Sequence, residues 1–294
     1  MDTANKMNFK VIYLKKNQGH GNARRFGLAN CSNELVALMD SDDISLPNRF
    51  HYQLKAFQDD PTLDIVGGQI TEFIGEPTNI IGKRVVPEKH DDIKAFMKKR
   101  CPMNQVSVMF KKSAVESAGG YLDWYCEEDY YLWIRMFLNG SKFANVPQTL
   151  VNVRIGDEMS ARRGGWKYFK SEKGIQKLLL KKRIISFFRY IYNVTIRFFG
   201  EVVVPAKLRT KLFKKMRNKN IAEIEEDANI EEITTKPFSV SMCVYDGDNS
   251  EWFDNAIASI MNQIIKPNEL VLVVDGPINN SLDDVIKKWK ALSN

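Results

Sequence analysis

The chain has 294 residues, of which 44% are hydrophobic and 27% are charged, and this composition excludes a protein that is disordered throughout. Four cysteines without a Cys-x-x-Cys spacing, and three histidines that do not cluster with them, argue against a zinc site or a disulfide framework and favour a reducing cytosol. The net charge of +7 is uneven, because residues 162–219 carry eighteen Lys or Arg against two acids, whereas residues 220–235 carry six acids and no base. Such a local excess argues against a nucleic-acid surface over the whole protein and indicates a local anionic partner, such as a membrane leaflet or a diphosphate.

The first elements follow an α/β pattern. Residues 9–14 alternate as in a β-strand, residues 17–21 form a glycine-containing turn, and residues 22–30 are expected to be helical. The amides at the start of that helix could bind phosphate, although Gly-x-Gly alone is a weak signal. Residues 1–6 lack the apolar core of a signal peptide.

Residues 33–43 are the most informative stretch. A short apolar strand runs into three carboxylates, Asp40, Asp42 and Asp43, within four residues. Ligands of open α/β sheets bind outside the carboxyl ends of the strands, so these acids are placed to meet a ligand. Clustered carboxylates repel one another, and a hard divalent cation that also binds nucleotide phosphates would supply the missing positive charge. The alternative is an acidic turn that caps a helix beginning near Leu46.

The middle of the chain continues the alternation of helices and strands. Residues 47–57 predict a helix, residues 64–70 and 105–110 predict strands, and residues 143–147 and 149–153 predict two further strands.

Residues 126–136 place three acids, Glu127, Glu128 and Asp129, at the start of another expected helix. Acids in the first turn of a helix favour its dipole, so capping explains them without any chemistry. Trp133 in the same helix is expected to pack in the core.

The segment that follows becomes basic. Residues 154–165 predict an arginine-containing loop, which could fold over a nucleotide diphosphate or be an ordinary solvated loop. Residues 166–217 are expected to be helical, but no uncharged apolar run reaches the roughly eighteen residues that a membrane span needs. An amphipathic helix on an anionic leaflet and helices packed on the preceding domain both fit this pattern. Residues 218–236 are acidic and are expected to be a linker.

Residues 237–294 look like the beginning of a sheet. A strand at 237–245, a helix at 252–262 and a buried strand at 269–274 form the first half of a nucleotide-binding sheet. Tyr245 ends the first strand, and Asp275 follows the second. Taken alone, they would be a half-buried aromatic residue and a turn residue.

Together these residues resemble glycosyltransferase family 2, the inverting enzymes of the GT-A fold. The motifs that carry the resemblance are Asn17-Gln18-Gly19, Ala23-Arg24, Asp40-Ser41-Asp42, Glu128-Asp129 with Leu132-Trp133, Tyr245 and Asp275. The resemblance implies an α/β GT-A (Rossmann-like) fold, with a mostly parallel sheet flanked by helices and here a basic helical extension. It also implies a metal-dependent, hexosyltransferase-like enzyme.

The resemblance implies that three residues bind the nucleotide of the donor. Tyr245 would stack on uracil, Asp275 would bond it, and Arg24 would lie near the base or the phosphates. The sequence departs from the family at Arg25, where the family usually carries Asn.

The resemblance implies that two further groups of residues, mostly acids, bind the metal and catalyse the transfer. Asp42 would hold Mn²⁺ or Mg²⁺ on the donor diphosphate, Asp40 would contact the ribose or the metal, and Ser41 would lie beside the nucleotide sugar. Asp129 would be the catalytic base, with Glu128 on the acceptor side.

The order of the chain departs from the family, in which the half resembling residues 237–294 comes first. Joining Asn294 to Asn8 restores the family order, so the chain is interpreted as a circular permutant. The expected parts are a nucleotide-sugar-binding and catalytic domain (1–160 plus 237–294), a basic amphipathic helical extension (161–217) and an acidic linker (218–236). Permutation predicts that the strand at 271–274 neighbours those at 240–244 and 35–39. A fragment of a tandem protein, with a sheet completed by a neighbouring chain, is the alternative.

The sequence therefore predicts an inverting glycosyltransferase that moves a sugar from a nucleoside-diphosphate sugar, expected to be UDP-linked, to a hydroxyl of a saccharide or lipid-linked acceptor, as in bacterial surface polysaccharide synthesis. One alternative is a non-catalytic basic module that docks on membrane or RNA through residues 162–219. A sugar nucleotidylyltransferase is another, although no Gly-rich loop with Arg and Lys follows Tyr245. The expected location is the cytoplasm, peripherally on the inner face of the cell membrane, and nucleic acid is not an expected partner.

Overall fold

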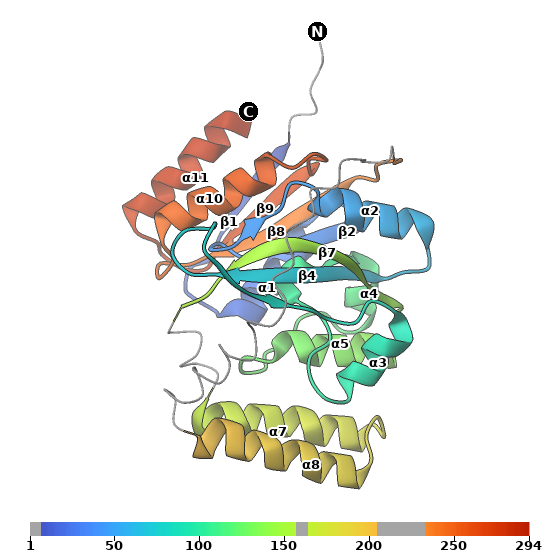
Figure 1. The fold of residues 1–294 in the computed structure, drawn as a ribbon. Helices are drawn as coiled ribbons and strands as arrows, with labels where there is room; N and C mark the ends of the chain where they lie inside the picture. Colours follow the sequence, from blue (N-terminus) through green and yellow to red (C-terminus); the bar gives the residue numbers. More distant parts are fainter. Residues whose placement is uncertain (1–6, 157–163, 205–232, 294) are drawn as a thin grey trace.

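The computed structural model describes residues 7–156, 164–204 and 233–293, which form a nine-stranded sheet flanked by helices (Figure 1). The strands lie in the order β1-β9-β8-β2-β6-β4-β7-β3, and β5 pairs with β4 outside this path. Their bounds are β1 Asn8–Tyr13, β2 Leu35–Met39, β3 Ile44–Ser45, β4 Ile65–Phe73, β5 Ile80–Arg84, β6 Met109–Lys111, β7 Phe143–Arg154, β8 Phe238–Val244 and β9 Glu269–Val274. Four neighbours, β1, β9, β8 and β2, run parallel, and β6 is antiparallel to β2 and β4. The α/β class with a mostly parallel sheet is confirmed.

Helices cover both faces of the sheet. In Figure 1, α2, α10 and α11 lie on one face and α1, α4 and α5 on the other, with the pair α7 and α8 outside α5. Their bounds are α1 His20–Asn30, α2 Arg49–Asp59, α3 His90–Met97, α4 Lys112–Ser117, α5 Glu128–Leu138, α7 Gly165–Lys181, α8 Phe187–Arg197, α10 Ser250–Met261 and α11 Asn280–Ser293. A short 3₁₀ helix, η1, spans Gln105–Ser107, where the sequence predicted the start of a strand, and a π-helical turn, η2, spans Phe198–Val203.

The apolar strand before the acidic turn is buried on both faces. Leu35, Ala37 and Met39 of β2 belong to the core under α2 and α10, whereas Val36 and Leu38 belong to the core under α1 and α5. A strand buried on both faces needs a continuous apolar run, which is the pattern that the sequence shows here. The strand therefore fixes the acids that follow it at the carboxyl edge of the sheet.

Two distant parts of the chain share this sheet. β8 and β9 lie between β1 and β2, with Leu35 opposite Phe238 and Asn8 opposite Glu269 in parallel register. The expected contact of the strand at 271–274 with the strand at 240–244 is present, but its expected contact with 35–39 is wrong. It is β8 that pairs with β2, and β9 pairs with β1 on its other side.

The two strands predicted at 143–147 and 149–153 are one strand, β7. Its register against β4 shifts, so that Gly68 pairs with Val146 but Gln69 pairs with Thr149. Proline has no N–H for the ladder and is tolerated in strands at such irregularities, which explains how β7 continues through Pro147.

Several expectations lie wholly or partly outside the described residues. They are the loop at 154–165 in its central part, the linker at 218–236 up to residue 232, the end of the basic extension, and the closeness of Asn294 to Asn8. Within the part of the linker that is described, Thr234 N donates to Gln58 Oε1 at 2.9 Å. Among the described helices, none is both long enough and apolar enough to cross a membrane.

Candidate functional site

Three parallel strands bring their carboxyl ends to one edge of the sheet. Asp40 follows β2, Tyr245 follows β8 and Asp275 follows β9. This is the edge at which open α/β sheets bind ligands. The structure therefore gathers predicted site residues from the first fifty and the last sixty positions of the sequence in one place.

Asp275 is buried and holds the turn that precedes α1. Its Oδ1 accepts a hydrogen bond from Gln18 N at 2.7 Å, and its Oδ2 accepts one from Gly19 N at 3.0 Å. The neighbouring Gly276 has a φ of 95°, and a Cβ there would lie 2.6 Å from the backbone N of Asn17. The turn and the end of β9 are thus fitted to each other, and only glycine meets both requirements at position 276.

Tyr245 is 40% exposed and covers a glycine. A Cβ at Gly247 would lie 2.5 Å from the Tyr245 ring, so the ring rests on this backbone. Asp248 fixes the same turn, since its Oδ2 accepts from Tyr245 N at 3.1 Å and from Ser41 Oγ at 2.9 Å. Asp248 was missed by the sequence analysis, because no local motif distinguishes it from Asp246 and only the fold brings it to Ser41.

Arg24 joins the acidic turn to the start of α5. Its Nη2 lies 2.8 Å from Asp40 Oδ1 and its Nη1 lies 3.3 Å from Glu128 Oε1, and only 7% of its side chain is exposed. Burial opposes the charge of Arg24, but attraction by Asp40 and Glu128 outweighs burial and raises its pKa. Burial also raises the pKa of Glu128, against the effect of Arg24.

The acids of the turn repel one another. Burial, together with the negative charges of Asp40 and Asp248, raises the pKa of Asp42 to about 7. Burial and the charge of Asp42 likewise raise the pKa of Asp43. Asp43 is tied to the end of β7, because its Oδ1 accepts the Arg154 backbone N–H at 2.8 Å.

Arg154, the last residue of β7, holds the acidic turn in place. Its Nε donates to Asp42 O at 3.2 Å, and its guanidinium carbon lies 4.5 Å from the centre of the Phe73 ring and 4.3 Å from that of Trp252. A guanidinium between two aromatic faces is held by cation–π attraction. The position of Asp42 therefore depends on side chains from three separate segments.

The oxygen donors of this turn fit a hard divalent cation in kind. Asp40, Asp42 and Asp248 supply carboxylates, and the charges of Asp40 and Asp248 add to burial in raising the pKa of Asp42. Across the described ranges, however, no three His, Cys, Asp or Glu side chains are grouped closely enough to hold a metal by themselves. A cation here would need phosphate and water among its ligands.

The first turn of α5 carries the predicted base. Asp129 Oδ1 accepts from Tyr130 N at 2.6 Å, and Cys101 Sγ lies 3.7 Å from its Oδ2. The preceding Glu127, which the sequence analysis gave no role, is buried and accepts from Tyr168 Oη of α7 at 2.9 Å. Trp133 is fully buried, as predicted.

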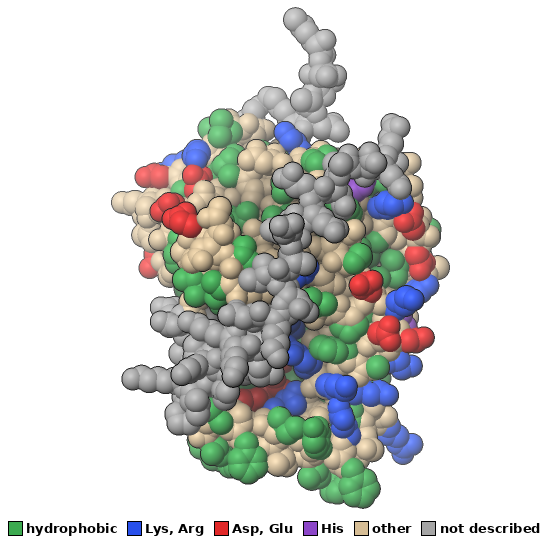
Figure 2. Space-filling view, in the orientation of Figure 1, with side chains coloured by type: hydrophobic (Ala, Val, Ile, Leu, Met, Phe, Trp, Pro, Cys, Tyr) green, Lys and Arg blue, Asp and Glu red, His purple; other side chains and the backbone are tan. Residues whose placement is uncertain are grey.

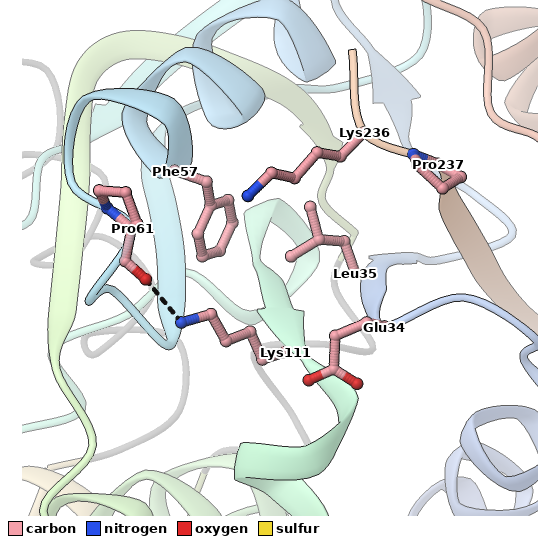
Figure 3. A pocket seen from close by; sticks show the side chains of 7 residues that line it. All are labelled: Glu34, Leu35, Phe57, Pro61, Lys111, Lys236 and Pro237. Carbon is pink, nitrogen blue, oxygen red and sulfur yellow. Dashed lines mark hydrogen bonds between the residues drawn. The ribbon is translucent and has the colours of Figure 1, made fainter. Parts of the chain in front are cut away.

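An apolar cavity of about 190 Å³ lies elsewhere (Figure 3). Its lining includes Leu35, the first residue of β2, and Pro237, just before β8, so it is at the amino ends of these strands. The length of β2 separates it from Asp40 by roughly 15 Å. The cavity is therefore not part of the site at the carboxyl edge.

The fold and this site together define a class of protein. A Rossmann-like sheet carries an acidic turn at its carboxyl edge, and a buried arginine connects that turn to an acidic helix start. The sheet and the helices that cover it have the architecture of the GT-A (Rossmann-like) fold.

Comparison with known proteins identifies the family. The family model described as Glycosyl transferase family 2 matches residues 2–116. An uncharacterised glycosyltransferase of Haemophilus influenzae is 37% identical over 214 residues, which cover 73% of this chain and 79% of the relative. The chain belongs to glycosyltransferase family 2.

Two further relatives have names that state a process or a reaction. The amylovoran biosynthesis glycosyltransferase AmsE of Erwinia amylovora is 35% identical over 214 residues, covering 73% of this chain and 79% of the relative. The UDP-Gal:alpha-D-GlcNAc-diphosphoundecaprenol beta-1,3-galactosyltransferase of Escherichia coli is 35% identical over 210 residues, covering 71% and 76%. Family membership favours a glycosyltransferase over the docking module and the nucleotidylyltransferase.

Proposed function

We propose that this protein is an inverting glycosyltransferase that uses a UDP-linked sugar and Mn²⁺ or Mg²⁺. The proposed acceptor is a hydroxyl of a saccharide carried by a lipid diphosphate, in the synthesis of a bacterial surface polysaccharide. The galactosyltransferase of Escherichia coli, whose name states a UDP-sugar and a lipid-linked acceptor, supports this choice.

The observation that carries the proposal is the double ion pair of Arg24. It connects Asp40, on the turn that would bind the donor, to Glu128, which directly precedes the proposed base. One buried side chain thus holds both the residues that would bind the sugar donor and those on the acceptor side. They keep a fixed distance and orientation, which a displacement reaction requires. Two independent binding surfaces would not need this connection.

In the proposed reaction, Tyr245 and Asp275 bind the uracil, while Asp40 and Ser41 face the ribose and the sugar diphosphate. A bound cation on Asp42 would offset the negative charge that develops on the departing diphosphate. Asp129 takes the proton of the acceptor hydroxyl, whose oxygen attacks the anomeric carbon from the opposite face.

Transfer assays with a panel of nucleotide sugars, each with and without Mn²⁺, test this proposal. Asp129→Asn should bind UDP as the wild type does but lose at least about a hundredfold in transfer rate, the usual contribution of a general base. Normal turnover by Asp129→Asn would remove that residue from the mechanism. Hydrolysis or transfer without any donor preference for uridine would overturn the assignment of the donor.

We also infer that residues 1–160 and 237–294 are one catalytic domain in permuted order, with 161–217 as its basic extension and 218–236 as the linker. The interleaving of β8 and β9 between β1 and β2 supports this inference. A rearranged gene that begins at residue 233, joins Ser293 to Met7 through a short Gly-Ser linker and ends at 217 should give a folded enzyme. An insoluble product, with the original order soluble, would contradict it.

The basic extension further supports a peripheral position at an anionic membrane surface, on the cytoplasmic side. A lipid-linked acceptor would be presented at such a surface.

A further inference from the structure

The outer face of α8 is apolar and exposed. Its exposed residues recur at helical spacing, and Phe188 is 84% exposed. The members of this face are Phe187, Phe188, Ile191, Tyr192 and Ile196, and Phe199 follows them in η2. Figure 2 shows aromatic side chains gathered at the end of the molecule where Figure 1 places α8.

The inner face of α8 carries polar contacts to α7 beside the half-buried Tyr190. Asn193 is buried and donates to Gln176 Oε1 of α7 at 2.8 Å, and Arg197 Nε lies 2.6 Å from Glu172 Oε2. A helix on the surface of a water-soluble domain normally buries its apolar side and exposes its polar side. α8 instead exposes most of its large apolar side chains, so its outer face is suited to an apolar environment.

Positive charge accompanies this face. In the described residues 164–204, the exposed charged side chains are all cationic: Lys167, Lys170, Lys173, Lys177 and Lys181 along one side of α7, then Lys182 and Arg183 in the connection to α8. The acids of the same segment, Glu172 and Glu201, are both partly buried. In Figure 2, Lys and Arg side chains lie next to the aromatic end rather than on it.

We propose that the outer face of α8 inserts into the interface of a bilayer that contains anionic lipid, while the lysines of α7 bind the headgroups. Aromatic and branched apolar side chains beneath a band of cations match the two layers of such an interface. The exposed charge beside this face has one sign, which complements the anionic headgroups of such a bilayer.

Docking in this way would orient the site. Tyr168 in the first turns of α7 bonds Glu127, which directly precedes Glu128 and the proposed base Asp129. The helix pair that meets the bilayer is therefore attached to the side of the site assigned to the acceptor. This orienting role rests on the proposed function, whereas the docking itself does not.

Vesicle flotation without any sugar nucleotide tests the docking alone. The full chain should float with phosphatidylcholine vesicles that contain about 30% phosphatidylglycerol and much less with pure phosphatidylcholine, because anionic lipid attracts the lysines. Phe187→Ser with Phe188→Ser should weaken binding about tenfold or more, since both rings leave water on insertion. Leu292→Ser, which alters an apolar residue on α11 that is 65% exposed, is the matched control and should bind normally.

A second pair of variants tests the role of charge. Lys173→Gln with Lys177→Gln should weaken binding to anionic vesicles about tenfold and reduce its salt dependence. Lys266→Gln with Lys290→Gln removes the same charge from exposed sites elsewhere and should have much less effect. Circular dichroism would verify that each variant is folded.

Three outcomes would overturn the docking proposal. These are failure of the folded wild type to bind anionic vesicles, equal binding by the phenylalanine variant and its control, and a concentration-dependent dimer that disappears in the phenylalanine variant. The last result would make α8 an interface between two copies of this chain. Because no donor is present, none of these results bears on sugar transfer, and loss of transfer with intact vesicle binding would reject only the proposed function.

Discussion

Arg24 is the residue whose replacement should reveal most about how the site is held together. Two unit charges about 4 Å apart attract each other by roughly 4 kcal/mol at an effective dielectric constant near 20. The Asp40 side chain is 28% exposed, so solvent screening reduces its share to about 2 kcal/mol. The longer contact with Glu128 adds about 1 kcal/mol on the same reasoning. Arg24→Met should therefore lower the free energy of unfolding by about 3 kcal/mol.

Urea unfolding without nucleotide or metal, followed by tryptophan fluorescence, measures this loss. The measurement belongs at about pH 8, where Asp42, with its pKa raised to about 7, is mostly ionised. In an Asp40→Asn background, Arg24→Met should cost about 2 kcal/mol less, since the stronger pair is already absent. Arg25→Met, which alters the exposed neighbouring arginine, should change stability by less than about 0.5 kcal/mol.

Equal losses for Arg24→Met in the two backgrounds would refute this reasoning. They would mean that Arg24 contributes through packing, and that its attraction to Asp40 is screened as it would be at the surface.

Two of the remaining predictions concern binding of UDP, measured by calorimetry, and the third concerns stability, measured by urea unfolding. Asp42→Asn should abolish the Mn²⁺-dependent part of UDP binding, and unchanged binding would remove Asp42 from the metal site. Tyr245→Ala should weaken binding by about 1–3 kcal/mol, the usual range for a base stacked on an aromatic ring, and a smaller loss would place the uracil elsewhere. Gly276→Ala should lower the unfolding free energy by about 1–3 kcal/mol, because its φ is 95° and its Cβ would lie 2.6 Å from Asn17 N. Wild-type stability of Gly276→Ala would show that the turn can move away.

Local patterns in the sequence were sufficient where a segment is buried on both faces. β2 and residues 270–274 of β9 are unbroken apolar runs, and each is followed directly by the acid that the sequence marks as a ligand residue. In these strands, consecutive apolar residues are enough to predict burial on both faces, and that burial fixes the position of the strand.

Where the position of an element depends on a distant segment of the chain, local sequence patterns did not predict it. The shift in β7 at Pro147 depends on the register of β4, and the contact of β9 with β1 depends on which edge remains open after β8 has paired with β2. Asp248 has no local motif, and only the fold brings it to Ser41.

The placement of β8 and β9 bears on the two interpretations of the chain order, circular permutant and tandem fragment. β1 pairs with β9 alone among the described strands, so residues 7–156 by themselves would leave β1 with no neighbour in the sheet. They would also leave the amides of Gln18 and Gly19 without Asp275, their acceptor from the other end of the chain. A tandem fragment would have to obtain both from a neighbouring molecule. In this structure one chain supplies both, and the acidic turn lies beside the ends of β8 and β9 within one molecule, which supports the permuted order that we propose.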